Sequence, residues 1–198
     1  MTVGSGAPAF VSGPKPPVHL CGTFESEFER RAALRKFFRA GLIAGERCAI
    51  NVDAADPTIT LSAIGTAAEI AQWRDEGLLT VLPAPTPDVP VDGVEEMIDV
   101  WDSFIERARH TPTRIGGEAT WWLHLVTPDR LLEYEEELEC SMPQQLSALC
   151  LYDRRRFDAD TVRHAIRIHP HLVTASRMFV TNDGYSLRDA SADGTFGD

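Results

Sequence analysis

Residues 149–171 of this 198-residue chain concentrate side chains that could do chemistry: LCLYDRRRFDADTVRHAIRIHPH. Cys150 and His169 in this stretch have the same residue types as His19 and Cys21 near the start of the chain. Cysteine and histidine are preferred ligands of zinc, so these four residues could together hold a metal ion. No pair among them has the spacing of a known zinc motif, so the sequence predicts neither a metal site nor a cofactor, with this cluster as the open alternative.

The same side chains could instead supply a nucleophile and its base, with Cys21 or Cys150 as the thiol and His19 or His169 as the base. Such a pair works only where the protein lowers the pKa of the thiol, which a sequence does not reveal. The GxSxG and HExxH motifs of common hydrolases are absent from the sequence. We therefore predict that the chain is not an enzyme, and we assign no catalytic residue.

Phosphate chemistry also lacks its usual sequence signals. The first predicted turn from a strand into a helix, CGTFESE, has one glycine and no lysine. A P-loop needs GxxxxGK[ST] so that its backbone N–H groups can wrap the phosphates. The formal charge of -11 argues against a nucleic-acid surface, because phosphate backbones are bound by clustered Lys and Arg. Neither unaided nucleotide hydrolysis nor direct nucleic-acid binding is predicted.

Hydropathy and cysteine spacing predict where the protein works. The sequence has no apolar run long enough to span a membrane, and its first residues lack the apolar core of a signal peptide. Its four cysteines include no CxxC pair, which favours reduced thiols over a disulfide framework. We expect a cytoplasmic protein with no membrane partner.

The elements that must position these side chains alternate between apolar strands and amphipathic helices. Strands are predicted at residues 18–21, 47–52, 78–82, 113–117 and 148–152, and LVTAS and RMFVT would close the sheet as a hairpin. This alternation predicts an α/β fold with three layers, in which helices cover both faces of a mostly parallel sheet. Residues 1–16 and 183–198 are rich in Gly, Ser and Asp or Pro, and we predict a disordered leader, a single domain over residues 17–182 and a flexible tail.

Helix starts and buried faces follow from caps and periodicity. Ser26 and Glu29 have capping-box spacing, Thr127 precedes a first-turn proline, and Asp158 caps the helix that Pro170 stops. A further helix is predicted from IGTAAEIAQW to Gly77, and another over VEEMIDVWDSFIERARH. The inward residues of the first helix are predicted to be Phe24, Phe28, Leu34, Phe38 and Leu42. In DRLLEYEEELEC the leucines and tyrosine should be buried, while the glutamates face water.

Four blocks of the sequence, in this order, resemble one family: VHLCGTFESEFERRAALRKFFRAGLIAGERCAI, RIGGEATW, LLEYEEELE and ALCLYDRRRFDADTVRHAIRIHPHLV. They are similar to the MEDS domain, the sensory domain of methanogens, methylotrophs and the regulator DcmR. The resemblance implies a RecA/KaiC-like fold without a functional P-loop, used as an input module for small organic molecules such as hydrocarbon derivatives. It covers about residues 17–182.

The resemblance also implies a set of ligand-binding residues. The matching positions are His19, Cys21, Glu118, Trp121, Cys150, Tyr152, Asp153 and His169. They fall at predicted strand ends or the turns that follow, where open α/β sheets place ligands. For each of them a purely structural role competes with ligand binding, since Cys150 could simply pack and Glu118 could be an exposed loop acid.

These observations predict a bacterial sensory module that binds a small organic ligand or a regulatory partner and performs no chemistry. Because nothing after residue 182 is long or periodic enough to fold, the signal is expected to pass in trans to a histidine kinase, an anti-sigma regulator or a transcription regulator. One alternative is a remnant RecA/KaiC-like ATPase with Glu118 as its general base. The other is a structural homodimer that pairs through an edge strand near RMFVT.

Overall fold

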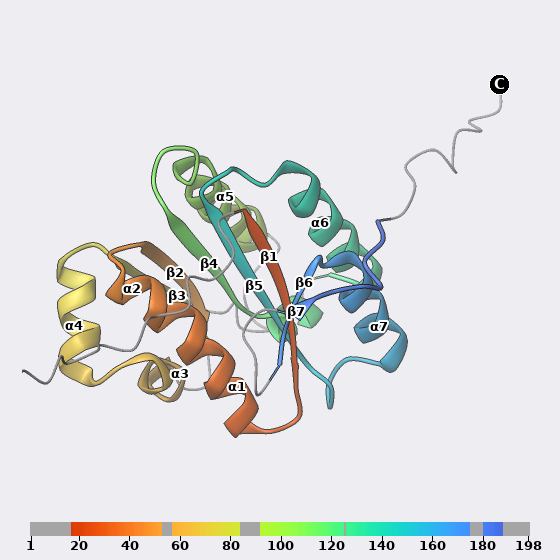
Figure 1. Cartoon of the computed structure of the whole chain (residues 1–198), viewed down its shortest axis with the longest axis horizontal. Helices are drawn as coiled ribbons and strands as arrows, with labels where there is room; N and C mark the ends of the chain where they lie inside the picture. The colour runs from red at the N-terminus through yellow and green to blue at the C-terminus, as the bar shows by residue number, and fades with distance from the viewer. Residues whose placement is uncertain (1–16, 53–56, 84–91, 125, 175–179, 188–198) are drawn as a thin grey trace, which may run out of the picture.

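A seven-stranded sheet forms the centre of the protein (Figure 1). The computed structural model describes residues 17–52, 57–83, 92–124, 126–174 and 180–187. The strands are β1 (Val18–Phe24), β2 (Arg47–Val52), β3 (Leu79–Pro83), β4 (Thr113–Glu118), β5 (Leu146–Asp153), β6 (His171–Val173) and β7 (Val180–Thr181). They lie in the order β3-β2-β4-β5-β1-β6-β7, and every neighbouring pair is parallel except β6 and β7. The predicted parallel sheet with a closing hairpin is confirmed.

Helices cover both faces of this sheet. They are α1 (Glu27–Leu34), the π-helix η1 (Arg35–Arg39), α2 (Ala40–Ile43), α3 (Pro57–Ile64), α4 (Ala67–Asp75), α5 (Asp92–Arg107), the 3-10 helix η2 (Ala119–His124), α6 (Pro128–Ser141) and α7 (Ala159–Ile168). The first four α-helices pack on one face with one apolar core, and α5, α6 and α7 pack on the other (Figure 1). The predicted three-layer α/β architecture is confirmed.

Strand β5 shows how the sequence assigns side chains to the two faces. Successive side chains of a strand point to opposite sides. Leu149 and Leu151 therefore lie in the core beneath α1–α4, whereas Tyr152 and the half-buried Cys150 pack with α6 and α7. Cys150 and Tyr152 consequently face the same pair of helices.

Strand β1 is longer than predicted, and this changes the location of His19. The strand was expected to end at Cys21 but continues to Phe24, because β5 pairs with it as far as Phe24 opposite Asp153. His19 is thus the second residue of a seven-residue strand and lies opposite Ala148. It sits toward the amino end of β1 rather than at the carboxyl edge of the sheet.

The helix that follows β1 begins where the cap predicts, but its buried face starts later than expected. Ser26 and Glu29 form the complete capping box. The inward residues are Arg30, Ala33, Leu34, Phe37 and Phe38, which follow the i, i+3, i+4, i+7, i+8 pattern of one helix face. The prediction that Phe28 is buried is wrong, since 77% of its surface is exposed.

One further difference concerns the number of helices. The sequence predicts a single helix between β2 and β3, whereas α3 and α4 are separate and Thr66 caps the second with its own capping box.

After β7, the N–H of Ser186 donates to the carbonyl of Arg167, and Leu187 packs against the core under α6 and α7. No helix in the described ranges is long and apolar enough to cross a bilayer.

Gly116 in β4 has a backbone conformation that other residues rarely adopt, with φ of 139°. A Cβ atom there would overlap the backbone oxygen of Leu149. Gly116→Ala is therefore expected to lower the free energy of unfolding by about 3 kcal/mol, through backbone strain and overpacking. Gly45 is the matched control, because its φ is 76° but no atom lies within 4 Å of an added Cβ.

Denaturant unfolding of the two variants measures this difference. Gly45→Ala should show only the left-handed backbone penalty of about 1 kcal/mol. Equal losses in both variants would contradict the close approach of β4 and β5 at Gly116.

Candidate functional site

Glu135 in α6 is the centre of a buried polar cluster. Its Oε2 lies 3.1 Å from His19 Nε2 and accepts a hydrogen bond from the Cys150 thiol at 3.1 Å, while the Tyr152 hydroxyl donates to Oε1 at 2.9 Å. Only 3% of the residue's surface is exposed. The prediction that the α6 glutamates face water is wrong at this position. Glu135 follows Leu131 by four residues and precedes Leu138 by three, so helical spacing places it on the apolar face.

The His19 ring lies between two carboxylates and has no contact with solvent. Its Nδ1 lies 3.0 Å from Glu139 Oε2, and its Nε2 faces Glu135. Ionised carboxylates only accept hydrogen bonds, so both ring nitrogens carry protons. Burial alone would lower the pKa of His19, but the hydrogen bonds and charges of Glu135 and Glu139 outweigh it and raise the pKa to about 9. The cluster therefore contains a buried imidazolium–carboxylate pair.

His169 is the second histidine of the cluster and has the opposite protonation state. Its Nδ1 donates to the backbone oxygen of Ala165 at 2.7 Å. Burial, together with the positive charge of His19, lowers the pKa of His169 to about 3, so the ring is neutral. Its Nε2 has no hydrogen-bond partner among the described residues and lies 3.8 Å from Glu135 Oε2. An unshared electron pair of His169 is thus directed into the cluster.

Cys150 lies close enough to His19 to suggest a nucleophile and base, with Sγ 3.6 Å from Nε2. The protonation states do not support that reading. Burial and the neighbouring charge of Glu135 raise the pKa of Cys150 well above its ordinary value, and burial likewise raises the pKa of Cys21. Activated thiols need a lowered pKa, and His19 is already protonated, so its ring cannot accept the proton of the thiol. The open Cys–His alternative is therefore disfavoured by the surroundings of the sulfur.

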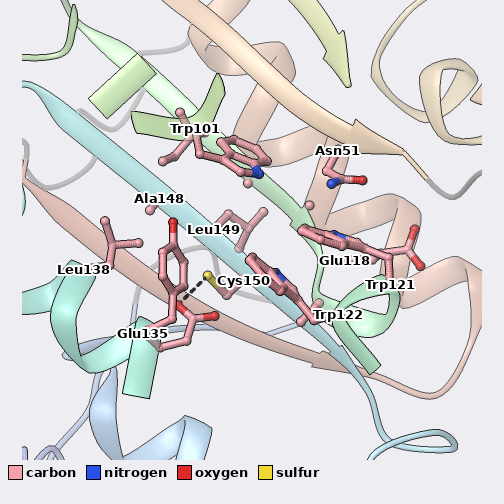
Figure 2. A pocket seen from close by; sticks show the side chains of 15 residues that line it. Asn51, Trp101, Glu118, Trp121, Trp122, Glu135, Leu138, Ala148, Leu149 and Cys150 are labelled. Carbon is pink, nitrogen blue, oxygen red and sulfur yellow. Dashed lines mark hydrogen bonds between the residues drawn. The ribbon is translucent and has the colours of Figure 1, made fainter. Parts of the chain in front are cut away.

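A pocket adjoins the cluster and shares Glu135 and Cys150 with it (Figure 2). It lies on the sheet beneath α5, η2 and α6 and has a volume of about 50 Å³. Four aromatic side chains form much of its wall: Trp101, Trp121, Trp122 and Tyr134. Trp121 and Trp122 stack with their ring centroids 4.2 Å apart, and Tyr134 follows at 5.4 Å from Trp122. The pocket is accordingly aromatic and mainly apolar.

Two polar side chains reach the opposite end of the pocket, at the carboxyl ends of β2 and β4 (Figure 2). Glu118 accepts a hydrogen bond from Arg30, whose guanidinium also donates to the Thr60 hydroxyl at 3.0 Å. Asn51 is 2% exposed, and neither its Nδ2 nor its Oδ1 has a hydrogen-bond partner within the described ranges. Buried amides are nearly always satisfied, so Asn51 is the polar group of this pocket that most clearly requires explanation.

Comparison with models of protein families identifies the family of this chain. The model of the family described as the methanogen/methylotroph, DcmR sensory domain, MEDS, matches residues 18–170. The chain belongs to the MEDS family. MEDS is a family of sensory domains, and the matched range contains every residue of the cluster and the pocket.

Other comparisons are less informative. Among solved structures, the cytoplasmic domain of EssC superposes with a TM-score of 0.47 at 7% sequence identity, covering 78% of this chain and 31% of that one. This chain therefore spans about a third of the length of that structure. No curated protein matches the chain by sequence.

The MEDS fold brings most of the predicted site residues together, in two groups. His19, Cys150, Tyr152 and His169 surround Glu135, while Glu118, Trp121 and Cys150 line the pocket. Cys21 packs in the apolar core under α6 and α7, and Asp153 forms an ion pair with Arg155 at 2.6 Å. The expectation that all eight lie at strand ends or in the turns that follow is wrong for His19, the second residue of β1, whereas Tyr152 is the penultimate residue of β5. The pocket reaches the carboxyl ends of β2 and β4 through Asn51 and Glu118.

The first turn of this MEDS domain is acidic where a P-loop would hold phosphate. The Glu29 carboxylate accepts hydrogen bonds from the backbone N–H groups of Glu25 and Ser26, at 2.9 and 3.2 Å. These hydrogen bonds lower the pKa of Glu29, so the start of α1 carries its negative charge, with Glu27 beside it in the first turn. Helix N-termini attract anions, and here a side chain of the protein already supplies one.

Proposed function

We propose that this MEDS domain is a sensor that binds a small organic molecule in the aromatic pocket, with the Asn51 amide as its polar anchor. The single observation that carries the proposal is the buried amide of Asn51, which has no hydrogen-bond partner among the described residues and lies at one end of a mainly apolar pocket. Leaving such groups unpaired costs about 1–3 kcal/mol, which a ligand with a matching polar group would recover. Apolar walls with a few placed polar groups are typical of small-molecule sites.

The pocket limits the size of the molecule and the strength with which it binds. A water molecule needs at least about 10–15 Å³, so 50 Å³ accepts about four non-hydrogen atoms without movement of side chains. The best small ligands gain about -1.5 kcal/mol per non-hydrogen atom, which gives about -6 kcal/mol here and a Kd no tighter than tens of micromolar. The proposed sensor therefore responds to small molecules at concentrations from tens of micromolar to millimolar.

We further propose that a regulatory protein reads the occupancy of the pocket and that the domain works in the cytoplasm without catalysis. A histidine kinase, an anti-sigma regulator or a transcription regulator would be such a reader. All four cysteines are free thiols, which suits a reducing compartment. The acidic start of α1 and the pairing of Glu118 with Arg30 argue against the alternative of a remnant ATPase.

Asn51→Leu separates a ligand-binding role of Asn51 from a structural one. Replacing an unpaired buried amide by an apolar side chain of similar size is expected to raise the free energy of unfolding by about 1 kcal/mol. The same change should abolish the response to ligand. Three probes of equal size test this in a thermal-shift measurement at millimolar concentration: acetone, acetamide and 2-propanol.

Wild-type protein should show a rise in Tm with at least one probe, because a ligand at a hundred times its Kd stabilises the native state by about 2.7 kcal/mol. Asn51→Leu should unfold at a higher temperature than wild type and show no rise. A variant that is strongly destabilised would instead assign Asn51 to the scaffold. An unchanged response to the probes would place the binding site elsewhere.

A further inference from the structure

Four side chains of the buried cluster present atoms that can ligate a metal ion: His19, Glu135, Cys150 and His169. One ligand atom from each lies within 4.8 Å of all the others. The shorter separations are 3.1 Å from Glu135 Oε2 to both His19 Nε2 and Cys150 Sγ, and 3.6 Å between those two atoms. Four ligands at about 2.0–2.3 Å from a tetrahedral ion lie at similar distances from each other. Small rotations of the side chains would close them around one ion.

The two histidines are oriented as metal-binding histidines are in proteins. A ligating imidazole usually donates its other ring N–H to a carboxylate or a backbone carbonyl, which fixes the ring. His19 Nδ1 faces Glu139, and His169 Nδ1 donates to the carbonyl of Ala165, so both Nε2 atoms are directed into the cluster. His169 Nε2 is the decisive one, because it is completely buried and has no other partner in the described part of the chain.

We propose that His19, Glu135, Cys150 and His169 bind one divalent transition metal ion of the zinc type. On binding, the Cys150 thiol and the Nε2 of His19 each release a proton to solvent. The thiolate and the Glu135 carboxylate then neutralise the dication, while the two imidazoles are neutral ligands. The Tyr152 hydroxyl keeps its hydrogen bond to the second oxygen of Glu135 and supports the ligand from outside.

The ligand set selects the class of ion. Two imidazole nitrogens and one thiolate are poor ligands for magnesium and calcium, which take oxygen ligands in larger numbers. They suit zinc, and cobalt(II) substitutes for it in the same geometry. Because the four ligands come from β1, α6, β5 and the end of α7, and all but the half-buried Cys150 are buried, the ion would hold α6 and α7 onto β1 and β5. This role does not depend on the ligand proposed for the neighbouring pocket.

Cobalt(II) is the sharpest probe, because a thiolate–cobalt bond absorbs in the near ultraviolet and tetrahedral cobalt absorbs in the visible. Full-length protein freed of metal by a chelator would be titrated with cobalt chloride and then with zinc chloride. We expect both absorption bands to rise to one cobalt per chain and to disappear when zinc is added. Cys150→Ser should remove the thiolate band and weaken metal binding at least about tenfold.

Cys140 provides the matched control, since it lies at the exposed end of α6 and outside the cluster. Cys140→Ser should leave both bands unchanged. Cys150→Ser preserves a donor to Glu135 and should fold, and circular dichroism of Cys150→Ser and Cys150→Ala would verify this. Failure of the metal-free wild type to bind cobalt, or loss of the bands in Cys140→Ser, would overturn the proposal. Neither result would affect the probe assay on the pocket, which needs no metal.

Discussion

Glu135→Ala is expected to lower the free energy of unfolding by about 3–5 kcal/mol, because it breaks a buried ion pair from one side. The substitution leaves the His19 imidazolium with one carboxylate in place of two. It also removes the acceptor of the Tyr152 hydroxyl and of the Cys150 thiol, both in buried surroundings. Each buried donor that loses its acceptor costs about 1–3 kcal/mol more, and rearrangement of neighbouring side chains reduces part of this cost.

Urea unfolding followed by circular dichroism measures this loss, with Glu137→Ala as the control in the same helix. The Glu137 side chain is 66% exposed, so its removal should change stability by less than about 0.5 kcal/mol. Similar small effects in both variants would contradict the central position of Glu135. Glu135→Gln should fall between the two, because it retains an acceptor while losing the charge.

Arg30→Ala is the second substitution with a large expected effect, about 3–5 kcal/mol of destabilisation, because it deletes a buried cation facing Glu118. The Arg30 guanidinium bridges three elements, contacting Glu27 in α1, Thr60 in α3 and Glu118 at the end of β4. Removing the guanidinium should also shift the Glu118 side chain, which lies with Asn51 at one end of the pocket. The thermal response to acetone, acetamide and 2-propanol should therefore fall together with stability.

Arg31→Ala is the matched control for this prediction. Arg31 is the next residue of α1 and bonds to the Ile59 oxygen and to Ser62 of α3, but its side chain is 39% exposed. Exposed polar contacts contribute about 0–1 kcal/mol, so this variant should retain both stability and the probe response. Retention of the response in Arg30→Ala would show that Glu118 is positioned without Arg30.

The fold was predictable because its signals are local. Ser26, Thr127 and Asp158 each cap a helix at the position that the sequence indicates. Alternation in ALCLY correctly placed Cys150 and Tyr152 on one face of a buried strand. Two predictions are wrong. The buried face of the first helix begins at Arg30, so it does not include Phe28. Strand β1 is longer than its sequence indicates, because its pairing with β5 extends it to Phe24.

The candidate site was predictable only in part, since its two central residues carry no local signal of chemistry. Glu135 is one of several glutamates in α6, and its helical spacing to Leu131 and Leu138 was the only sign of burial. Asn51 is a single amide near the end of an apolar strand, and nothing in the sequence shows that it lacks hydrogen-bond partners among the described residues. Both depend on which elements pack together, which is set by long-range strand order rather than by neighbouring residues.

The most direct test of the proposed sensor follows its tryptophan indole N–H signals in a proton–nitrogen NMR spectrum during titration with acetamide. The chain has four tryptophans. Trp101, Trp121 and Trp122 line the pocket, whereas Trp73 packs in the core on the opposite face of the sheet. We predict saturable shifts of the three pocket signals while the Trp73 signal stays in place. Uniform movement of all four signals, or no movement at millimolar acetamide, acetone and 2-propanol, would contradict a binding site in this pocket.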